Sequence, residues 1–299
     1  MNNKRRAVEQ KLAVSITCVA TIITSLLLVL IVGKIAFEAL PVLNLHFITT
    51  AEVDSHQLGQ AIGNSLVGTL LFSMLSVLFA IPISLGTAIY LKKYSTDNLL
   101  TRGIRLMIEV LSGMPSIVLG VFGLLFIVIY LRPLTGGFSL LSGALAMAVL
   151  ITPVIERASE EAIGAVPKEL EEGSYALGAS RWKTTSRITI PYALSGIITG
   201  IIIGIGRSAE ESAIVALTAG YSQFYPTIEI LSKSSMPGGI LIGPLQEPIG
   251  VLSISVYNAY EFANIVPRAN AFAIAMVLIC VVMIINIFAR LILWRWKSG

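Results

Sequence analysis

Six apolar runs, each long enough to cross a bilayer, constrain the fold of this 299-residue chain more than any other feature. In lipid every backbone polar group must be hydrogen-bonded within the protein, which leaves only helices or closed barrels. Runs of about 20 residues match the length of helical spans rather than strands. We therefore expect an all-α polytopic membrane protein whose six spans lie at 12–32, 61–91, 104–131, 138–155, 192–220 and 271–293.

The composition and the first run both agree with a membrane protein. Hydrophobic residues make up 55% of the chain and charged residues 13%, which is too little polar surface for a soluble globule of this size. The 12–32 run is longer than the apolar region of a cleaved signal peptide, and no small-x-small cleavage site follows it. We expect it to be a retained span. Pro82, Pro115 and Pro153 are expected to lie inside spans, where neighbouring helices tolerate them.

The basic residues predict the topology. Sixteen Lys and Arg residues lie in the segments 1–11, 92–105, 156–191 and 290–299, whereas four lie in the intervening loops and one, Arg207, lies within a span. Cytoplasmic segments carry such an excess. We expect a multi-pass protein of the plasma (inner) membrane with both termini in the cytoplasm. The net charge of +4 reflects this bias, and no nucleic-acid partner is expected.

The same pattern predicts the domain organisation. An N-terminal span and external loop occupy 1–60, a transmembrane core occupies 61–293, and a cytoplasmic tail occupies 294–299. Within the core, 156–191 is the long cytoplasmic segment and 221–270 is a Pro-rich external loop. The apolar stretch 251–262 in that loop is too short to span and predicts a re-entrant or surface helix.

Motifs of catalysis and of metal or cofactor binding are missing from the sequence. It contains no GxxxxGK[ST] loop, no GxSxG and no HExxH. Cys18 and Cys280 lie in apolar runs, and His46 and His56 lie ten residues apart among polar loop residues. We predict no catalytic residue, no metal and no cofactor, which favours transport over enzymatic activity.

Arg207 places a charge near the middle of the predicted fifth span. Such a charge costs at least about 3 kcal/mol in lipid, which makes the residue a functional candidate. At about 100° per residue, Gly196, Gly200, Gly204, Arg207 and Glu211 share a sector about 80° wide. Glycines at this spacing allow close helix packing, and the i,i+4 spacing allows Arg207 and Glu211 to pair.

Two interpretations of this face remain open. The charged pair either only fixes helix packing, or it belongs to a substrate pathway in which the Arg207 guanidinium binds two oxygens of a tetrahedral oxyanion. Glu211 then holds Arg207 when substrate is absent, or accepts a proton from the oxyanion. Glu210 lies about 40° outside the sector.

The cytoplasmic segment 156–191 predicts a short surface helix. Pro167 suits a helix start, the residues from Glu169 onward form about three amphipathic turns, and Gly178 can end them. A solvated loop without a partner is the alternative for this segment.

At this segment the chain resembles permease subunits of ABC importers, whose loop carries the pattern E-A-A-x3-G-x9-I-x-L-P. Glu172, Gly178, Ile188 and Pro191 stand at the matching positions. The resemblance implies the type I importer permease fold and a coupling helix that docks on a separate ATPase subunit. The residues to which it assigns ATPase coupling are Glu169, Glu172, Gly178 and Ala179.

The match is narrower still, because IGNSLVGTLLFSMLSVLFAIPISLGTAIYL, PSIVLG and RSAEES resemble phosphate importer permeases of the PstA type. That family has an R-A-x-G-E-T-like element in its fifth span. Arg207 matches its arginine, Glu211 matches its glutamate, and Glu210 replaces its glycine. Arg157, before Glu160 and Glu161, matches a further family arginine.

The resemblance implies transport of phosphate by alternating access and four kinds of partner besides membrane lipid. They are phosphate, an ATP-binding cassette ATPase dimer, a second homologous permease and an extracytoplasmic phosphate-binding protein. The closest alternative is an importer of the same class for molybdate, tungstate or sulfate. A secondary transporter normally shows paired internal repeats, which are not evident here. An enzyme that uses Glu210 and Glu211 is disfavoured, because adjacent helical residues point about 100° apart.

Overall fold

The computed structural model describes residues 3–55, 59–232 and 240–297, so His56 lies outside the described residues. In chain order the described elements are α1 (Asn3–Ala39), α2 (Leu45–Thr49), η1 (Glu52–Asp54), α3 (Gly63–Ile89), η2 (Tyr90–Tyr94), α4 (Leu99–Gly113), α5 (Ser116–Gly123), η3 (Leu124–Tyr130), α6 (Arg132–Thr135), α7 (Leu140–Gly164), α8 (Lys168–Ala176), α9 (Arg181–Thr184), η4 (Thr185–Thr189), α10 (Ile190–Glu210), α11 (Ala213–Thr218), β1 (Ile230–Ser232), β2 (Ile240–Ile242), α12 (Leu252–Glu261) and α13 (Arg268–Lys297).

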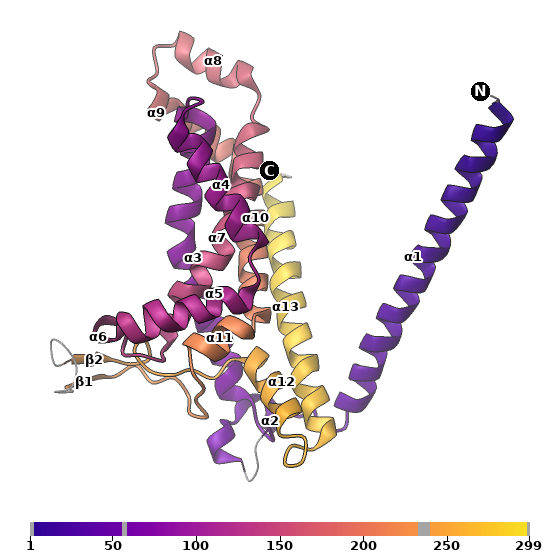
Figure 1. Cartoon of the computed structure of the whole chain (residues 1–299), viewed down its shortest axis with the longest axis vertical. Helices are drawn as coiled ribbons and strands as arrows, with labels where there is room; N and C mark the ends of the chain where they lie inside the picture. The colour runs from indigo at the N-terminus through magenta and orange to yellow at the C-terminus, as the bar shows by residue number, and fades with distance from the viewer. Residues whose placement is uncertain (1–2, 56–58, 233–239, 298–299) are drawn as a thin grey trace.

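The predicted all-α architecture with up to six spans is confirmed. Within the described residues, five helical stretches are long and apolar enough to cross a membrane, and a bent helix pair is the sixth candidate. α3, α7 and α10 run side by side in Figure 1 and α13 lies next to α10, with α8 projecting beyond one end of the bundle and the β1–β2 hairpin lying toward the other. We call these the α8 end and the hairpin end. The antiparallel hairpin, with three residues in each strand, is a small exception to the helical fold.

The sixth candidate corrects the prediction of a continuous helix at 104–131. It consists of Leu99–Gly113 and Ser116–Tyr130, which meet at an angle of 105°. Pro115 therefore does not lie inside a helix. Its ring disfavours helical geometry at Met114, which is extended at ψ 135°, and Gly113 is the last residue of α4. Pro82 and Pro153, in contrast, lie within α3 and α7 as predicted.

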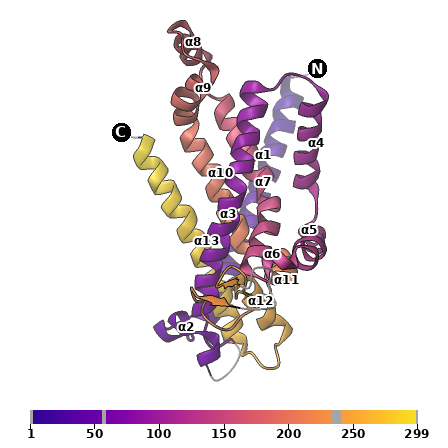
Figure 2. The same cartoon turned by 90° about the vertical axis from the view of Figure 1, so that its left-hand side faces the viewer.

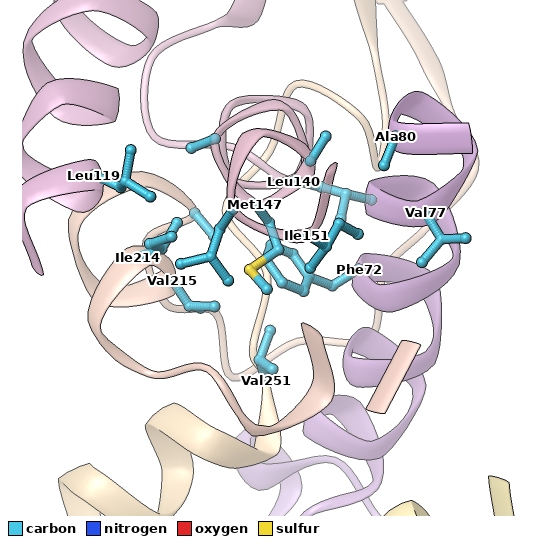
Figure 3. Close-up of a cluster of buried hydrophobic side chains, with 14 of the residues drawn as sticks. Phe72, Val77, Ala80, Leu119, Leu140, Met147, Ile151, Ile214, Val215 and Val251 are labelled. Carbon is cyan, nitrogen blue, oxygen red and sulfur yellow. The ribbon is translucent and has the colours of Figure 1, made fainter. Parts of the chain in front are cut away.

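The centre of the bundle is the pair α3 and α7, which pack closely. Their contact is rich in small buried residues, which allow helices to approach each other in lipid. The Ser84 hydroxyl lies 3.1 Å from the carbonyl oxygen of Thr152 on α7. Toward the hairpin end, Phe72 and Met147 are fully buried between α3, α7 and α11 (Figure 3). This cluster fixes the position of α11 directly after the end of α10.

α1 differs from the other spans because it stands away from the bundle over most of its length (Figures 1 and 2). None of its most apolar 18-residue window is buried. Its last residues approach α13 at the hairpin end, where Ala39 is fully buried. The first described residues of α1 and the last residues of α13 lie toward the α8 end (Figure 1).

Several helices extend beyond their predicted limits. α7 continues to Gly164, past the predicted end at 155, and α13 continues to Lys297, past the predicted end at 293. Hydropathy marks the apolar part of a helix, whereas its hydrogen bonding continues into polar sequence. The short helix predicted at 251–262 is present as α12.

Candidate functional site

The predicted fifth span is broken at the residues that carry its charge, which corrects the prediction of a helix over 192–220. α10 ends at Glu210, and Glu211 has extended backbone geometry at φ −75° and ψ 122°. The carbonyl of Glu211 accepts a hydrogen bond from the Ser253 hydroxyl at 2.9 Å. Its side-chain Oε1 accepts from the backbone N–H of Ala213 at 3.2 Å. These bonds satisfy backbone groups at the break between α10 and α11. Arg207 lies in the last turn of α10, directly before this break.

Arg207 and Glu211 are brought together, but only loosely. The Arg207 Nη2 to Glu211 Oε2 distance is 3.8 Å, which is longer than a hydrogen bond. The Glu211 side chain is 9% exposed and the Arg207 side chain 54%. Within the described residues no hydrogen bond holds the guanidinium. Arg207 therefore presents a planar set of N–H donors at a helix break, whereas the Glu211 carboxylate is held at the start of α11.

The three glycines of the predicted face lie against α7. A Cβ atom on Gly196 would come within 2.5 Å of the Ala162 Cβ, and one on Gly200 within 2.6 Å of the Ala158 Cβ. At Gly204 it would meet the Ile155 side chain at 2.9 Å. Side chains at these positions would therefore push the two helices apart. This face of α10 therefore has two parts. The glycines are covered by α7, whereas the Arg207 side chain is exposed, and we call this second part the open charged part.

Glu210 and Arg157 are both exposed, and neither belongs to the loose pair formed by Arg207 and Glu211. Arg157 lies on α7, one residue after Glu156, whose side chain is 1% exposed and whose Oε1 has no hydrogen-bond partner among the described residues. Sequence analysis missed Glu156, although a carboxylate directly after the apolar run is visible in the sequence. The structure does not join Arg157 to Arg207 in one charged cluster.

The acidic residues of α8 are divided between two faces. Glu169 and Glu172 are exposed, whereas Glu171 is half-buried and Ser174, three residues later, is buried. The exposed surface also carries apolar side chains, among them Leu170 and Tyr175 on α8 and Leu177 and Trp182 after it. α8 thus has an outward face of acidic and apolar groups and an inward face directed at the bundle.

Glu171 is the residue on the inward face that sequence analysis missed. Its Oε1 lies 2.5 Å from the Lys93 Nζ of η2 and accepts a hydrogen bond from the Thr189 hydroxyl of η4 at 2.6 Å. Burial by itself raises the pKa of Glu171. The hydrogen bonds from Lys93 and Thr189 and the positive charge of Lys93 outweigh that effect, so the pKa lies below its usual value of 4.5. Glu171 is therefore ionised at neutral pH.

The turn after α8 is built as its sequence predicts. Gly178 has φ +78°, a conformation that glycine adopts without strain. Its N–H donates to the Tyr175 carbonyl at 2.9 Å, and the Ala179 N–H donates to the Ser174 carbonyl at 3.1 Å. The Ser174 hydroxyl and the Thr184 hydroxyl are hydrogen-bonded at 2.9 Å in a buried position. These contacts fix α9 against α8.

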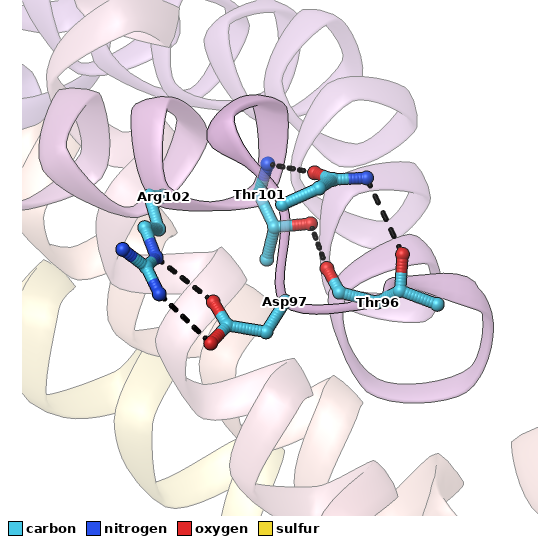
Figure 4. Close-up of polar contacts among 5 residues, drawn as sticks. Thr96, Asp97, Thr101 and Arg102 are labelled. Carbon is cyan, nitrogen blue, oxygen red and sulfur yellow. Dashed lines mark hydrogen bonds and ion pairs between the residues drawn. The ribbon is translucent and has the colours of Figure 1, made fainter.

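Three other ion pairs of the described residues lie at the α8 end. Glu160 on α7 pairs with Arg105 of α4 at 2.9 Å and with Lys92 of η2 at 4.0 Å. Asp97 and Arg102 form a two-point ion pair at the start of α4 (Figure 4), in which both side chains are at least 70% exposed. The Arg102 guanidinium lowers the pKa of the Asp97 carboxyl.

The hairpin end contains a hydrogen-bonded network that the sequence did not reveal. Glu52 accepts from the Tyr221 hydroxyl and, at 3.0 Å, from the Gly59 N–H. Asn64 accepts from the Glu52 N–H at 3.1 Å and donates to the Ser222 carbonyl at 2.9 Å. Burial, and then the Glu52 charge, raise the pKa of Tyr221. This network joins the start of α3 to the loop after α11.

A cavity of about 1100 Å³ opens beside this network. Its lining includes Arg132, Tyr221 and Glu247, from α6 and from both arms of the long loop. None of the predicted site residues lines it. The predicted site is therefore the open charged part of α10, whereas the cavity belongs to the hairpin end.

Three relatives are similar in sequence to this chain along nearly its whole length. A probable ABC transporter permease protein, YqgI, of Bacillus subtilis is 34% identical over 95% of each chain. The phosphate transport system permease protein PstA 2 of Mycobacterium bovis is 31% identical, over 95% of this chain and 88% of its own. A probable phosphate transport system permease protein PstA of Methanocaldococcus jannaschii is 29% identical, over 95% and 94%.

Solved structures show the same fold at lower identity. A bacterial ABC transporter involved in alginate import is similar with a TM-score of 0.65 and 17% identity, covering 98% of this chain and 99% of its own. A chain of the MetNI methionine ABC transporter, in an inward-facing conformation, has a TM-score of 0.58 and 18% identity, covering 78% and 95%. The family described as the binding-protein-dependent transport system inner membrane component matches residues 80–297. This chain, a multi-pass membrane protein with the ABC importer permease fold, belongs to that family.

Proposed function

We propose that the chain is the permease subunit of an ATP-driven importer that moves inorganic phosphate into the cytoplasm by alternating access. The observation that carries this proposal is its similarity, along 95% of its length, to relatives named phosphate transport system permeases. The competing classes, secondary transport and membrane catalysis, have no comparable support.

The loose pair of α10 supports the choice of an oxyanion as substrate. A guanidinium that lacks a hydrogen-bonded partner can bind two oxygens of phosphate and stays charged in an apolar setting. Arg207 meets this requirement because its side chain is 54% exposed and 3.8 Å from Glu211. Glu211 balances the charge when the site is empty. Glu210 and Arg157, both exposed, are further residues of the proposed pathway.

The outward face of α8 supports a separate ATPase partner. The sequence has no nucleotide-binding P-loop, so hydrolysis is assigned to an ATP-binding cassette dimer rather than to this chain. Glu169 and Glu172, with the apolar groups around them, form the surface that docks on it. The Gly178–Ala179 turn fixes the end of this surface. The α8 end, toward which the first described residues of α1 and the last residues of α13 lie, is then cytoplasmic.

Two partners complete the proposed complex. A second homologous permease forms the other half of the pathway, and an extracytoplasmic phosphate-binding protein delivers substrate at the hairpin end. The apolar side chains exposed on α4 and α5 face lipid or this second permease.

The direct test measures the uptake of labelled phosphate by the complex reconstituted in vesicles. ATP is supplied on the side of the membrane where the ATPase is bound. Arg207→Gln is expected to reduce uptake by about a hundredfold, since it removes a charge-assisted contact of about 2–3 kcal/mol. Arg102→Gln is the matched control, because Arg102 is an exposed arginine of the same chain with a partner of its own. Undiminished uptake by the assembled Arg207→Gln complex contradicts a role of Arg207 in the substrate pathway. The remaining interpretation is then that the Arg207–Glu211 pair only fixes helix packing.

Competition decides which oxyanion is carried. Unlabelled phosphate should suppress uptake at concentrations at which molybdate, tungstate and sulfate do not. Stronger suppression by one of these three ions would assign the same site to that ion. Glu172→Ala tests the docking face separately, and we expect it to weaken co-purification of the ATPase while the membrane subunits remain folded.

A further inference from the structure

The residues that join α8 to the rest of the bundle suggest how α8 acts. By chain connectivity, α8 is linked to α7 through 165–167 and to α10 through α9 and η4. α3 has no such link to α8. Lys93, in the π-helical turn η2 that continues α3, is hydrogen-bonded to Glu171 of α8 across 78 residues of sequence.

The geometry of this contact marks it as fixed. The Lys93 side chain is 17% exposed and the Glu171 side chain 14%, and their charged atoms are 2.5 Å apart. The same carboxylate oxygen accepts the Thr189 hydroxyl at the start of α10. A charge pair that is mostly shielded from water, and whose carboxylate accepts a second hydrogen bond, is costly to open.

The neighbouring lysine makes a useful contrast. Lys92 lies 4.0 Å from Glu160 on α7 and is 41% exposed. α3 and α7 are already in close contact along the bundle, so this second pair adds little to their connection. Two adjacent lysines of one turn thus point to different helices, and only Lys93 reaches α8.

We propose that Lys93 and Glu171 are positioning residues that connect α8 to α3, so that movement of α8 by the ATPase also moves α3. The inference rests on the proposed function of α8 as the coupling helix. Without the Lys93–Glu171 bridge, α8 reaches α3 only indirectly, through its chain links to α7 and α10 and the packing of those helices on α3. ATP hydrolysis then continues while transport per ATP falls.

The first experiment measures uptake and ATP hydrolysis on the same reconstituted complex. Lys93→Met is expected to lower phosphate imported per ATP hydrolysed by about tenfold, which is within the range of coupling between sites in proteins. Lys92→Met is the matched control and is expected to keep the wild-type ratio. A wild-type ratio in the Lys93→Met complex overturns the proposal.

A charge exchange separates coupling from folding. Glu171→Lys and Lys93→Glu are each expected to lower the ratio, and their combination to restore at least half of it. A combined variant that assembles but couples no better than the single variants overturns the proposal. Loss of stability alone would reduce the amount of complex and leave the ratio unchanged.

The second experiment needs no transported substrate. Spin labels at Asp97 and Lys168, with Cys18→Ser and Cys280→Ser, report the distance between the start of α4, next to η2, and the start of α8. Both sites are exposed, and neither belongs to the surface that docks on the ATPase. In the complex with ATPase, ATP should leave this distance distribution narrow in the parent and broaden or shift it in Lys93→Met.

The two proposals fail in different ways. Identical responses to ATP in the parent and in Lys93→Met overturn the bridge, whatever the substrate. A parent complex that imports no phosphate but shows the difference between the labelled proteins contradicts the proposed substrate and supports the bridge.

Discussion

Two cation–glutamate pairs of this chain differ in how tightly the structure holds them. Lys93 and Glu171 at the α8 end are 2.5 Å apart and mostly shielded from water. Arg207 and Glu211 at the break of α10 are 3.8 Å apart, with the arginine 54% exposed. In the first pair each charge is satisfied by the protein. In the second pair the guanidinium retains donors for another group. The comparison shows that a closed pair fixes two elements together, whereas an open pair leaves a binding group available.

The strongest way to sharpen this contrast is to keep the charge of the open pair and change its shape. Arg207→Lys retains a cation but loses the planar fork that binds two oxygens. We expect phosphate uptake to fall by about 10- to 100-fold, since hydrogen bonds to charged groups contribute about 1.5–3 kcal/mol. Initial uptake rates over a range of phosphate concentrations measure the effect. Full activity would mean that charge alone is needed.

A second comparison removes one carboxylate charge from each pair. Glu171→Gln should lower the free energy of unfolding by about 1–3 kcal/mol, because it weakens a shielded charge-assisted bond. Glu211→Gln should cost less than about 1 kcal/mol, because the amide oxygen still accepts from Ala213. Thermal melting of the purified chain in detergent measures both. Equal destabilisation would remove the distinction between closed and open pairs.

The closed pair also has a defined pH dependence. Because the pKa of Glu171 in the folded chain is lowered below 4.5, its contribution to stability is present above that value and is lost as the pH falls through the folded-state pKa. The difference in melting temperature between wild type and Glu171→Gln should therefore persist from about pH 7 to about pH 5 and shrink below 4.5. A difference that already disappears near pH 6 contradicts the assigned shift.

The smallest effect is expected for the exposed ion pair in Figure 4. Asp97 and Arg102 make two hydrogen bonds, yet both side chains are at least 70% exposed, so water and salt screen their attraction. Asp97→Asn should leave the melting temperature and the uptake rate unchanged within error. A clear loss would show that short distance alone, without shielding, is enough to stabilise a pair.

The features that the sequence predicted correctly depend on hydropathy averaged over many residues or on local helix-start and helix-stop residues. Apolar runs located the spans, the short run at 251–262 predicted α12, and Pro167 with Gly178 delimited α8. These features follow from hydropathy and local backbone preference, which act within a few turns of chain.

The sequence did not predict where helices break inside an apolar run. Pro115 stands at a bend of 105°, whereas Pro82 and Pro153 lie within helices, although all three are surrounded by apolar residues. The break after Glu210 depends on the Ser253 hydroxyl, which comes from α12, 42 residues after Glu211. A hydropathy pattern cannot predict a hydrogen bond between residues so far apart in the sequence.

Glu171 illustrates the same limit for the candidate site. The motif resemblance draws attention to Glu172, which is exposed, while its neighbour makes the contacts with the bundle. Sequence spacing places Glu171 and Ser174 on one face of a helix. The inward face is the one that contacts Lys93 and Thr189, which lie 78 and 18 residues away in the sequence, beyond the reach of helical spacing.

The separation of α1 from the bundle has a consequence for how its sequence can change. At about 1.5 Å per residue, the apolar part of α1 is about as long as the hydrocarbon core is thick. Since none of its most apolar window is buried by this chain, no packing contact within the chain constrains the identity of those side chains. Exchanges among Leu, Ile and Val should be neutral there as long as length and hydropathy are kept. Any position in that window that rejects such an exchange must contact another subunit of the complex.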